Sequence, residues 1–391
     1  EDTKAAMVYA DHFNQVGDVR TNAPVIDYQL GSIRDDFEFG SVLFYRTSAV
    51  KEAVARMDVD YQYAGLYDLR LKVSQKGALE HINEYLYYDV ELDNRTTGEK
   101  NFDYVDPKNR GVQIEMEQAV TQHLKDINGY LAPGFKDVDL HCDGFEYEAS
   151  VIIPCKNRVR TIGTAIKSAL SQVVKAPYKF NVIVVDDNSE DGSVDVIKSI
   201  VAEGHENLTY IAQDKTWHAI GGNWNVALHH EKCGRFAIQL DSDDTYFDEN
   251  TVQKFIDAFH EQNCAMVVGT YQLTDFDGNM IPPGVIDHKE WTPDNGRNNA
   301  LRIHGLGAPR GFYTPMLRTI NFPTTKYGED YAVGLRVSRE YQIGRIYDVV
   351  YNCRRWDDNS DANCDIVTMN NNHLYKDRIR TWELKARIQM N

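Results

Sequence analysis

The chain has 391 residues, and its 42 Lys and Arg against 59 Asp and Glu give a formal net charge of −17. Hydrophobic residues make up 42% of it and aromatic residues 11%, which is enough for folded cores and excludes wholesale disorder. The negative charge argues against a nucleic-acid or anionic-membrane binder, because both need a basic surface. No stretch approaches the ~20 apolar residues of a membrane span, and the N-terminus does not read as a signal peptide, so we expect a cytoplasmic protein.

The N-terminal segment has a pattern that returns later in the chain. AAMVYADHF, APVIDYQ, SVLFYRTSAVKEAV and YAGLYDLRLKVS occur in the same order as CAMVVGTYQ, PGVIDHK, RGFYTPMLRTI and YGEDYAVGLRVS. Residues 5–95 thus resemble residues 264–352, which we interpret as an internal duplication of one half-module. The alternative is chance similarity between two α/β segments.

A helix and a boundary follow this segment. Residues 113–130 have the apolar spacing of an amphipathic helix, which we expect to link two parts of the chain. A new strand begins near residue 147, after a polar connection that contains glycines. We therefore expect a small α/β unit at 1–100, a linking helix and loop at 101–146, a larger domain at 147–365 and a C-terminal helix at 366–391.

Residues 150–260 alternate between strand and helix patterns. SVIIP, FNVIVVDD, LTYIAQ and RFAIQLD read as strands, and TIGTAIKSALSQ, SVDVIKSIVAEG and GGNWNVALHHEK read as the helices between them. This alternation predicts an α/β fold with a doubly wound, mostly parallel sheet. In such sheets, ligands bind outside the carboxyl ends of the strands.

Polar clusters stand at three of these strand ends. The first strand ends in residues 154–158, the second in Asp186 and Asp187, and the fourth in residues 241–244. We expect the three clusters to converge on one crevice, because the carboxyl ends of parallel strands share an edge of the sheet.

The third cluster is an acidic run with Asp241, Asp243 and Asp244. Three carboxylates within four residues repel one another unless a cation lies among them, and Mn²⁺ or Mg²⁺ prefers carboxylate and phosphate oxygens. The run therefore predicts a metal-diphosphate site. The alternative is an acidic N-terminus of the next helix, where Asp244 and Asp248 would favour the dipole, but the position at a strand end favours the site.

Two further acidic groups are candidates for chemistry. Asp187 can accept hydrogen bonds from a base or a ribose hydroxyl, while the alternative is that this loop caps the helix at Ser193. Glu329 and Asp330 precede an apolar-periodic helix, where an acid is usually only a favourable charge. If it faces the crevice, it becomes a candidate general base for an attacking hydroxyl.

Five motifs occur in a set order along the second half of the chain: SVIIPCKNR, VIVVDDNSEDGS, GGNWNVAL, QLDSDD and GEDYAVGLRVS. Together they strongly resemble the family-2 glycosyltransferases with the GT-A fold, over about residues 148–365. The resemblance implies an inverting hexosyltransferase of polysaccharide biosynthesis. Such an enzyme moves a sugar from a UDP- or GDP-linked donor to a hydroxyl of a saccharide or other acceptor, with a divalent metal, Mn²⁺ or Mg²⁺, as cofactor.

The resemblance assigns donor-side roles by position. Asp187 would bind the base, and Asp241 and Asp243 would hold the ribose and the metal, with Asp244 beside them. The nucleotide pocket would also be lined by Pro154, Asn157 and Arg158.

On the acceptor side, Asp330 aligns with the catalytic base of the family and Glu329 with the acid that neighbours it. We expect acceptor specificity to reside in the loops around residues 275–310, which are rich in Asp, Asn, Gly and Pro. The candidate acceptor contacts are Trp291, Arg310, Tyr313 and Trp356.

The sequence departs from the family pattern in three places. Trp224 stands where the family often has Arg, and Trp356 stands where a His would complete the metal shell. The N-terminal segment has Gly65 and Leu66 in register with Glu329 and Asp330, so we expect no catalysis from it. A non-catalytic glycan- or nucleotide-binding scaffold is the alternative function.

Overall fold

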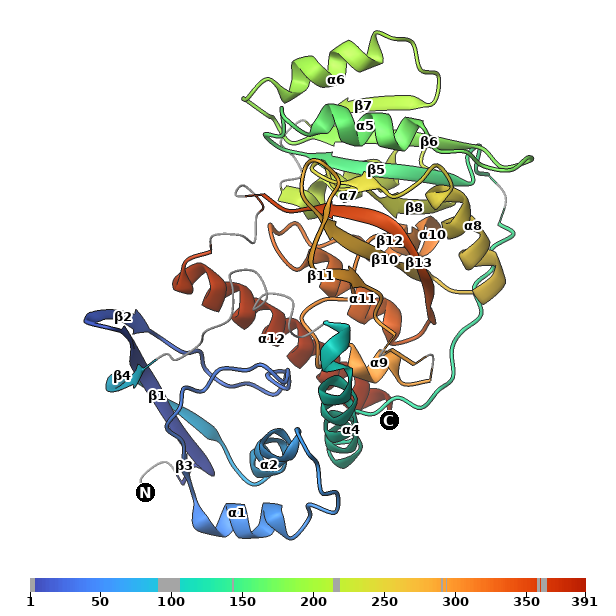
Figure 1. The fold of residues 1–391 in the computed structure, drawn as a ribbon. Helices are drawn as coiled ribbons and strands as arrows, with labels where there is room; N and C mark the ends of the chain where they lie inside the picture. The colour runs from blue at the N-terminus through green and yellow to red at the C-terminus, as the bar shows by residue number, and fades with distance from the viewer. Residues whose placement is uncertain are drawn as a thin grey trace. The chain divides into compact units, whose positions relative to one another are not determined.

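The computed structural model describes residues 4–90, 106–142, 144–213, 219–289, 291–292, 294–356, 359 and 364–391. By their contacts the residues form two units, which Figure 1 shows together. The first unit contains Glu1–Ala132, Asn295–His304 and Asp358–Asn391, and the second contains Pro133–Asp294 and Gly305–Asp357. Part of the predicted linking segment, residues 101–105, lies outside the described residues.

The described residues of the second unit form a nine-stranded sheet. Its strand order is β7-β6-β5-β8-β12-β10-β13-β9, with β11 beside β10. The β7-β6-β5-β8 part is entirely parallel, β12 runs antiparallel to both its neighbours, and β13 is parallel to β10. The predicted α/β fold class is therefore confirmed. The strands are β5 (Ala149–Cys155), β6 (Phe180–Asp186), β7 (Leu208–Ala212), β8 (Phe236–Gln239), β9 (Thr245–Tyr246), β10 (Met266–Thr274), β11 (Met280–Ile286), β12 (Arg310–Tyr313) and β13 (Ile343–Arg354).

Helices connect these strands and bury their apolar stripes against the sheet. All seven residues of β5 are buried, as expected for a strand covered on both faces. Ile162, Ala165, Ile166 and Ala169 recur at helical spacing on α5, which packs on β5 and β6. Complete burial of an Ile side chain contributes about 1.5–3 kcal/mol. The helices are α5 (Ile162–Leu170), α6 (Ser193–Val201), α7 (Ala219–His229), α8 (Thr251–Gln262), α10 (Thr314–Ile320) and α11 (Glu329–Ser338).

The first unit has a smaller sheet around β1 (Met7–Val16). Its core is built from apolar side chains of the sheet, of the segment between β2 and β3, and of α1 and α2, including Met7, Tyr9, Phe37 and Phe39. The other elements are β2 (Val19–Ala23), β3 (Phe44–Tyr45), β4 (Leu79–Val90), α1 (Thr47–Val54), α2 (Gly65–Ser74), η1 (Pro107–Asn109), α4 (Arg110–Asp126), α9 (Gly296–Asn299) and α12 (Ile366–Met390).

Buried charges tie α12 into the first unit. Asp377 is completely buried, and its Oδ1 lies 2.7 Å from Arg380 Nη1 and 3.3 Å from Arg34 Nε. Arg380 Nη2 also donates to the Ile303 carbonyl at 2.8 Å. Because a buried charge is tolerated only when it is paired and hydrogen-bonded, these contacts specify how the last helix joins the N-terminal sheet.

The two segments that resemble each other in sequence have the same strand pairing. β1 is antiparallel to β2 and β3 and parallel to β4, just as β10 is antiparallel to β11 and β12 and parallel to β13. Met7 pairs with Leu79 and Met266 pairs with Ile343, and each parallel pair breaks register on both sides of the fifth residue, Asp11 in β1 and Thr270 in β10. Both the pairing and the irregularity therefore recur at corresponding residues.

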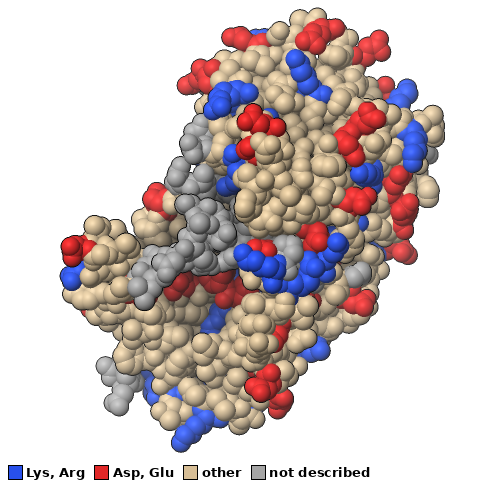
Figure 2. Space-filling view, in the orientation of Figure 1, with Lys and Arg blue, Asp and Glu red and all other residues tan. Residues whose placement is uncertain are grey.

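In the part of the chain that the structure describes, no helix combines the length and apolarity needed to cross a membrane. Acidic and basic side chains are interspersed over the face of the molecule that Figure 2 shows.

Candidate active site

Two loops at the carboxyl ends of β5 and β6 are bonded to each other. The Asp187 N–H donates to the Cys155 carbonyl at 2.9 Å, and Lys156 Nζ lies 3.2 Å from Asp187 Oδ2. The Asn157 N–H donates to Ser189 Oγ at 2.8 Å, and Asn157 has a left-handed φ of 52°, which Asn tolerates better than most residues. Asp187 is 5% exposed, so these bonds fix a nearly buried carboxylate at the sheet edge.

The loop after β5 also meets the acidic run after β8. Arg158 Nε lies 3.4 Å from Asp243 Oδ2, and Arg354 Nε donates to the Asp243 carbonyl at 2.6 Å. The Arg354 N–H donates to Asp244 Oδ1 at 2.8 Å. Two arginines, one from the loop after β5 and one from the end of β13, thus bracket the acidic run.

A second set of contacts links the acidic run to α11. Gln239 Nε2 donates to both carboxylate oxygens of Asp241 at 2.9 Å, and Arg310 Nε donates to Gln239 Oε1 at 3.0 Å. Arg310 Nη1 in turn forms an ion pair with Asp330 Oδ2. The structure therefore brings the predicted nucleotide-side and acceptor-side acids to one edge of the sheet, as strand order requires.

Burial and mutual repulsion shape the charges of this edge. Desolvation raises the pKa of Asp241, helped by the neighbouring Asp243 charge, and it raises the pKa of Asp244 well above its usual range for the same two reasons. Burial opposes the charge on Arg310, but Asp330 and Asp241 outweigh it and raise its pKa. The site therefore combines repelling carboxylates with a firmly charged guanidinium.

Glu329 differs from its neighbour Asp330. It is 7% exposed, and burial together with the Asp330 charge raises its pKa to about 8. Gly328 begins the helix with a left-handed φ of 74°, which glycine adopts readily. At neutral pH Glu329 is therefore mainly protonated and can donate a hydrogen bond, whereas Asp330 lies against a cation.

The acidic run fits a divalent metal only in part. The Asp244 carboxylate is buried against the backbone of β13, and among the described residues no three His, Cys, Asp or Glu side chains form a group that could hold a metal ion. Asp241 and Asp243 remain as two oxygen donors whose repulsion a cation would relieve. A site built on them needs further oxygen ligands, which a diphosphate has.

The aromatic candidates lie in different places. Trp224 is buried and stacks on Phe322 with ring centroids 5.0 Å apart, so it is core rather than a phosphate contact. Trp291 is also buried, with the Arg345 guanidinium 4.2 Å from its ring. Trp356 lies beside Arg158, whose guanidinium carbon is 6.0 Å from the ring, and therefore stands on the nucleotide side.

Two predicted acceptor contacts come from β12, which runs antiparallel to β8. Tyr313 pairs with Phe236 at the start of β8, away from Asp241, and its hydroxyl donates to the Asp139 carbonyl at 2.6 Å. Arg310, at the other end of β12, contacts Asp330 directly. Of the two, only Arg310 reaches the candidate site, where it contacts the Asp330 carboxylate.

Three residues of this site were not singled out from the sequence: Lys156, Gln239 and Arg354. Gln239 has the clearest sequence signal, because it is a polar residue in an apolar strand, two positions before an acid. Lys156 stands directly after β5, whereas the role of Arg354 depends on a strand pairing that its local sequence does not reveal.

Comparison with known proteins identifies this part of the chain. The family model described as glycosyl transferase family 2 matches residues 150–321. The chain contains a family 2 glycosyltransferase domain. The matched residues include the strand ends that carry Asp187 and Asp241, whereas Asp330 follows the matched segment.

Individual relatives of the glycosyltransferase domain are distant. Poly(ribitol-phosphate) beta-glucosyltransferase of Bacillus spizizenii is 25% identical over 53% of this chain and 32% of its own length. UDP-Glc:alpha-D-GlcNAc-diphosphoundecaprenol beta-1,3-glucosyltransferase WfgD of Escherichia coli is 25% identical over 51% of this chain and 74% of its own. A solved structure of S. aureus TarS 1–349 with UDP-GlcNAc has a TM-score of 0.47 at 23% identity, covering 61% of this chain and 72% of that one. The chain thus spans about a third of the Bacillus relative.

Proposed function

We propose that the second unit is an inverting, metal-assisted glycosyltransferase that moves a hexose from a UDP- or GDP-linked donor to an acceptor hydroxyl. The observation that carries the proposal is the chain of contacts that runs from Asp187 through the acidic run to Asp330, inside and next to the matched glycosyltransferase domain. The name of the Escherichia coli relative supports UDP-glucose as the first donor to test. Polysaccharide synthesis is the process we propose for it.

Donor binding would use the loops after β5, β6 and β8. Asp187 is held at the sheet edge, where it can accept hydrogen bonds from the base. Arg158 and Arg354 place positive charge beside Asp243, where they can meet the donor diphosphate. Mn²⁺ or Mg²⁺ would be held by Asp241 and Asp243, and when bound it would neutralise charge on the leaving diphosphate.

Proton transfer would use Asp330. Arg310 keeps a positive charge against its carboxylate and, through Gln239, links its position to Asp241. Asp330 would accept the proton of the acceptor hydroxyl while the hydroxyl oxygen attacks the anomeric carbon, and the diphosphate would leave from the opposite face. Inversion follows from this in-line geometry. Protonated Glu329 would donate a hydrogen bond to the acceptor.

We also propose that the N-terminal segment is a degenerate copy of the acceptor half of this domain. The corresponding pairing and register of β1–β4 and β10–β13 support it. Gly65 and Leu66 stand in register with Glu329 and Asp330, so this copy would lack both acids.

The test of the proposed function is release of UDP or GDP from a panel of UDP- and GDP-hexoses, with and without Mn²⁺. We expect release with Mn²⁺ and its loss in Asp243→Ala. Glu249→Gln, which removes an exposed acid from the segment directly before α8, is the control and keeps full activity. Undiminished turnover in Asp243→Ala would remove the assigned metal site, and calorimetric binding of donor without its consumption by the unaltered chain would favour a scaffold.

A further inference from the structure

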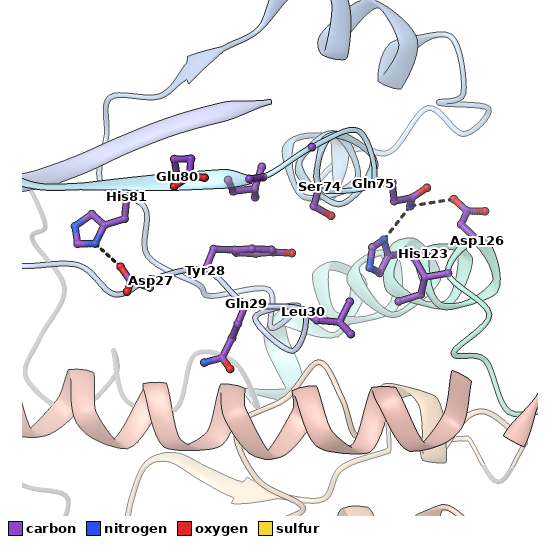
Figure 3. A pocket seen from close by; sticks show the side chains of 14 residues that line it. Asp27, Tyr28, Gln29, Leu30, Ser74, Gln75, Glu80, His81, His123 and Asp126 are labelled. Carbon is purple, nitrogen blue, oxygen red and sulfur yellow. Dashed lines mark hydrogen bonds and ion pairs between the residues drawn. The ribbon is translucent and has the colours of Figure 1, made fainter. Parts of the chain in front are cut away.

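The first unit contains a cavity of about 840 Å³ that lies outside the glycosyltransferase domain. It is formed by the end of α2 and the start of β4, by the segment Asp27–Leu30 and by the end of α4 (Figure 3). A volume of this size lies within the range of about 300–1,000 Å³ that ligand pockets occupy. The cavity is therefore large enough for a small ligand.

The lining of this cavity is polar and carries no basic side chain of Lys or Arg among the described residues that form it. Its carboxylates favour hydroxyl donors and repel anions, while its amides and hydroxyls can exchange hydrogen bonds with the same groups. Figure 3 shows Tyr28 between His81 and Ser74, where its ring offers an apolar surface. The polar lining consists of Asp27, Tyr28, Gln29, Ser74, Gln75, Glu80, His81, His123 and Asp126.

Internal contacts hold several of these groups in place. The ring nitrogens of His81 each lie 2.9 Å from a carboxylate oxygen, Nε2 from Asp11 and Nδ1 from Asp27. Gln75 Nε2 lies 3.0 Å from His123 Nδ1 and 3.2 Å from Asp126 Oδ2. The polar groups are thus positioned before a ligand arrives, which lowers the entropy lost on binding.

The charge state of His123 suits a neutral ligand. Its ring is buried, and desolvation together with the nearby Arg70 charge lowers its pKa to about 4. At neutral pH the His123 ring is therefore an uncharged hydrogen-bonding group in the cavity wall.

Comparison with the second copy of the sheet explains how the space arises. With β4 and β13 in register, Gly77 and Ala78 occupy the positions of Tyr341 and Gln342. Small residues therefore stand where the glycosyltransferase domain has large ones. At the same edge, Glu80 stands where that domain has Gly344. The N-terminal copy therefore has both more space and an added hydrogen-bond acceptor.

We propose that this cavity binds a neutral saccharide, as a second carbohydrate site apart from the donor and acceptor sites of the glycosyltransferase domain. Carboxylates, amides and an aromatic ring, in a cavity whose described lining has no Lys or Arg, match a ligand with many hydroxyl groups and an apolar ring face. The choice of carbohydrate rests on the proposed function, in which a glycan is the acceptor. A site of this kind would hold a growing or neighbouring chain while transfer takes place elsewhere.

Isothermal titration of the intact chain tests this site with cellotriose, maltotriose and triacetylchitotriose, and with spermidine and Mn²⁺ as cation probes. We expect one trisaccharide to bind. Its Kd should rise at least about tenfold in Glu80→Gln, which removes a charged hydrogen-bond acceptor, and in Tyr28→Phe, which removes a hydroxyl. Glu84→Gln is the matched control, because this exposed acid lies on the same strand but outside the cavity. It leaves Kd unchanged, and so does Asp330→Asn.

Three results overturn the second site: no trisaccharide binds, the Kd is unchanged in both Glu80→Gln and Tyr28→Phe, or a cation probe binds in place of sugar and is lost in Glu80→Gln. Nucleotide release by the unaltered chain tests the proposed function separately. A chain that releases nucleotide but binds no trisaccharide through Glu80 overturns the second site alone, and the reverse outcome overturns the proposed transfer reaction alone.

Discussion

The sheets around β1 and β10 share their pairing but differ in what their following helices contain. α11 begins with Glu329 and Asp330, whereas α2 begins with Gly65 and Leu66, and Leu66 is 81% exposed. The backbone arrangement therefore persists without the acids. The comparison teaches that strand register in this molecule is set by the apolar positions, while the two acids proposed for catalysis are confined to one helix terminus.

The largest expected difference between the two segments is the effect on transfer of replacing Asp330. Asp330→Asn keeps the shape of the side chain but removes its ability to accept a proton, so kcat for transfer falls about 10²- to 10⁴-fold. Leu66→Asn at the corresponding position leaves kcat unchanged. Nucleotide release in the presence of acceptor measures both, and thermal unfolding checks that both variants fold. Equal activity of Asp330→Asn and the unaltered chain would rule out this base.

The second difference is the pH dependence of stability that Glu329 contributes, because the residue in register with it, Gly65, does not titrate. The raised pKa of Glu329, about 8, means that the folded state keeps a proton that the unfolded state releases near pH 4.5. Glu329 therefore lowers stability progressively as pH rises from about 4.5 to 8, by about 1.4 kcal/mol for each unit of pKa difference. Glu329→Gln removes this penalty. Calorimetric Tm of the variant minus that of the unaltered chain should grow across this window and then level off, and a constant difference would contradict the raised pKa.

A third difference lies deeper in the same helices. Gly334 of α11 corresponds to Arg70 of α2, and an added Cβ at Gly334 would overlap Leu306 Cδ1. Gly334→Ala should destabilise the glycosyltransferase domain by about 1–3 kcal/mol, because overpacking forces neighbours to shift. Urea unfolding measures the loss, and unchanged stability would show that Leu306 can move without cost.

The smallest expected effect is at Gly65. No heavy atom lies within 4 Å of a Cβ added there. Gly65→Ala should therefore stabilise α2 by less than about 1 kcal/mol, because alanine is the better helix former. The same urea experiment measures it. A loss of stability at Gly65 as large as that at Gly334 would mean that the two helices do not differ in their freedom to accept side chains.

Much of the site could be predicted because it depends on strand ends. Asp187, Asp241 and Arg158 follow apolar runs with clear strand patterns, and the carboxyl ends of parallel strands share an edge. The acids of α11 could be found from their place before a periodic helix.

The remaining contacts could not be predicted, because they depend on pairings between distant segments. β12 enters the sheet antiparallel between β8 and β10, which brings Arg310 to Gln239 and carries Tyr313 to the opposite end. The hydrophobic periodicity of a strand does not indicate whether that strand runs parallel or antiparallel to its neighbours. The place of residues 295–304 and α12 in the first unit likewise depends on contacts between distant segments, such as that of Asp377 with Arg34 and that of Arg380 with the Ile303 carbonyl, which a local pattern cannot reveal.

The buried pairing of Asp377 has a consequence for biosynthesis on the ribosome. Every residue of the glycosyltransferase domain is synthesised before α12. Arg34 is synthesised before that domain, yet it gains its partner Asp377 only once α12 has been made. The first unit therefore cannot complete its buried ion pairs until the whole glycosyltransferase domain has been translated.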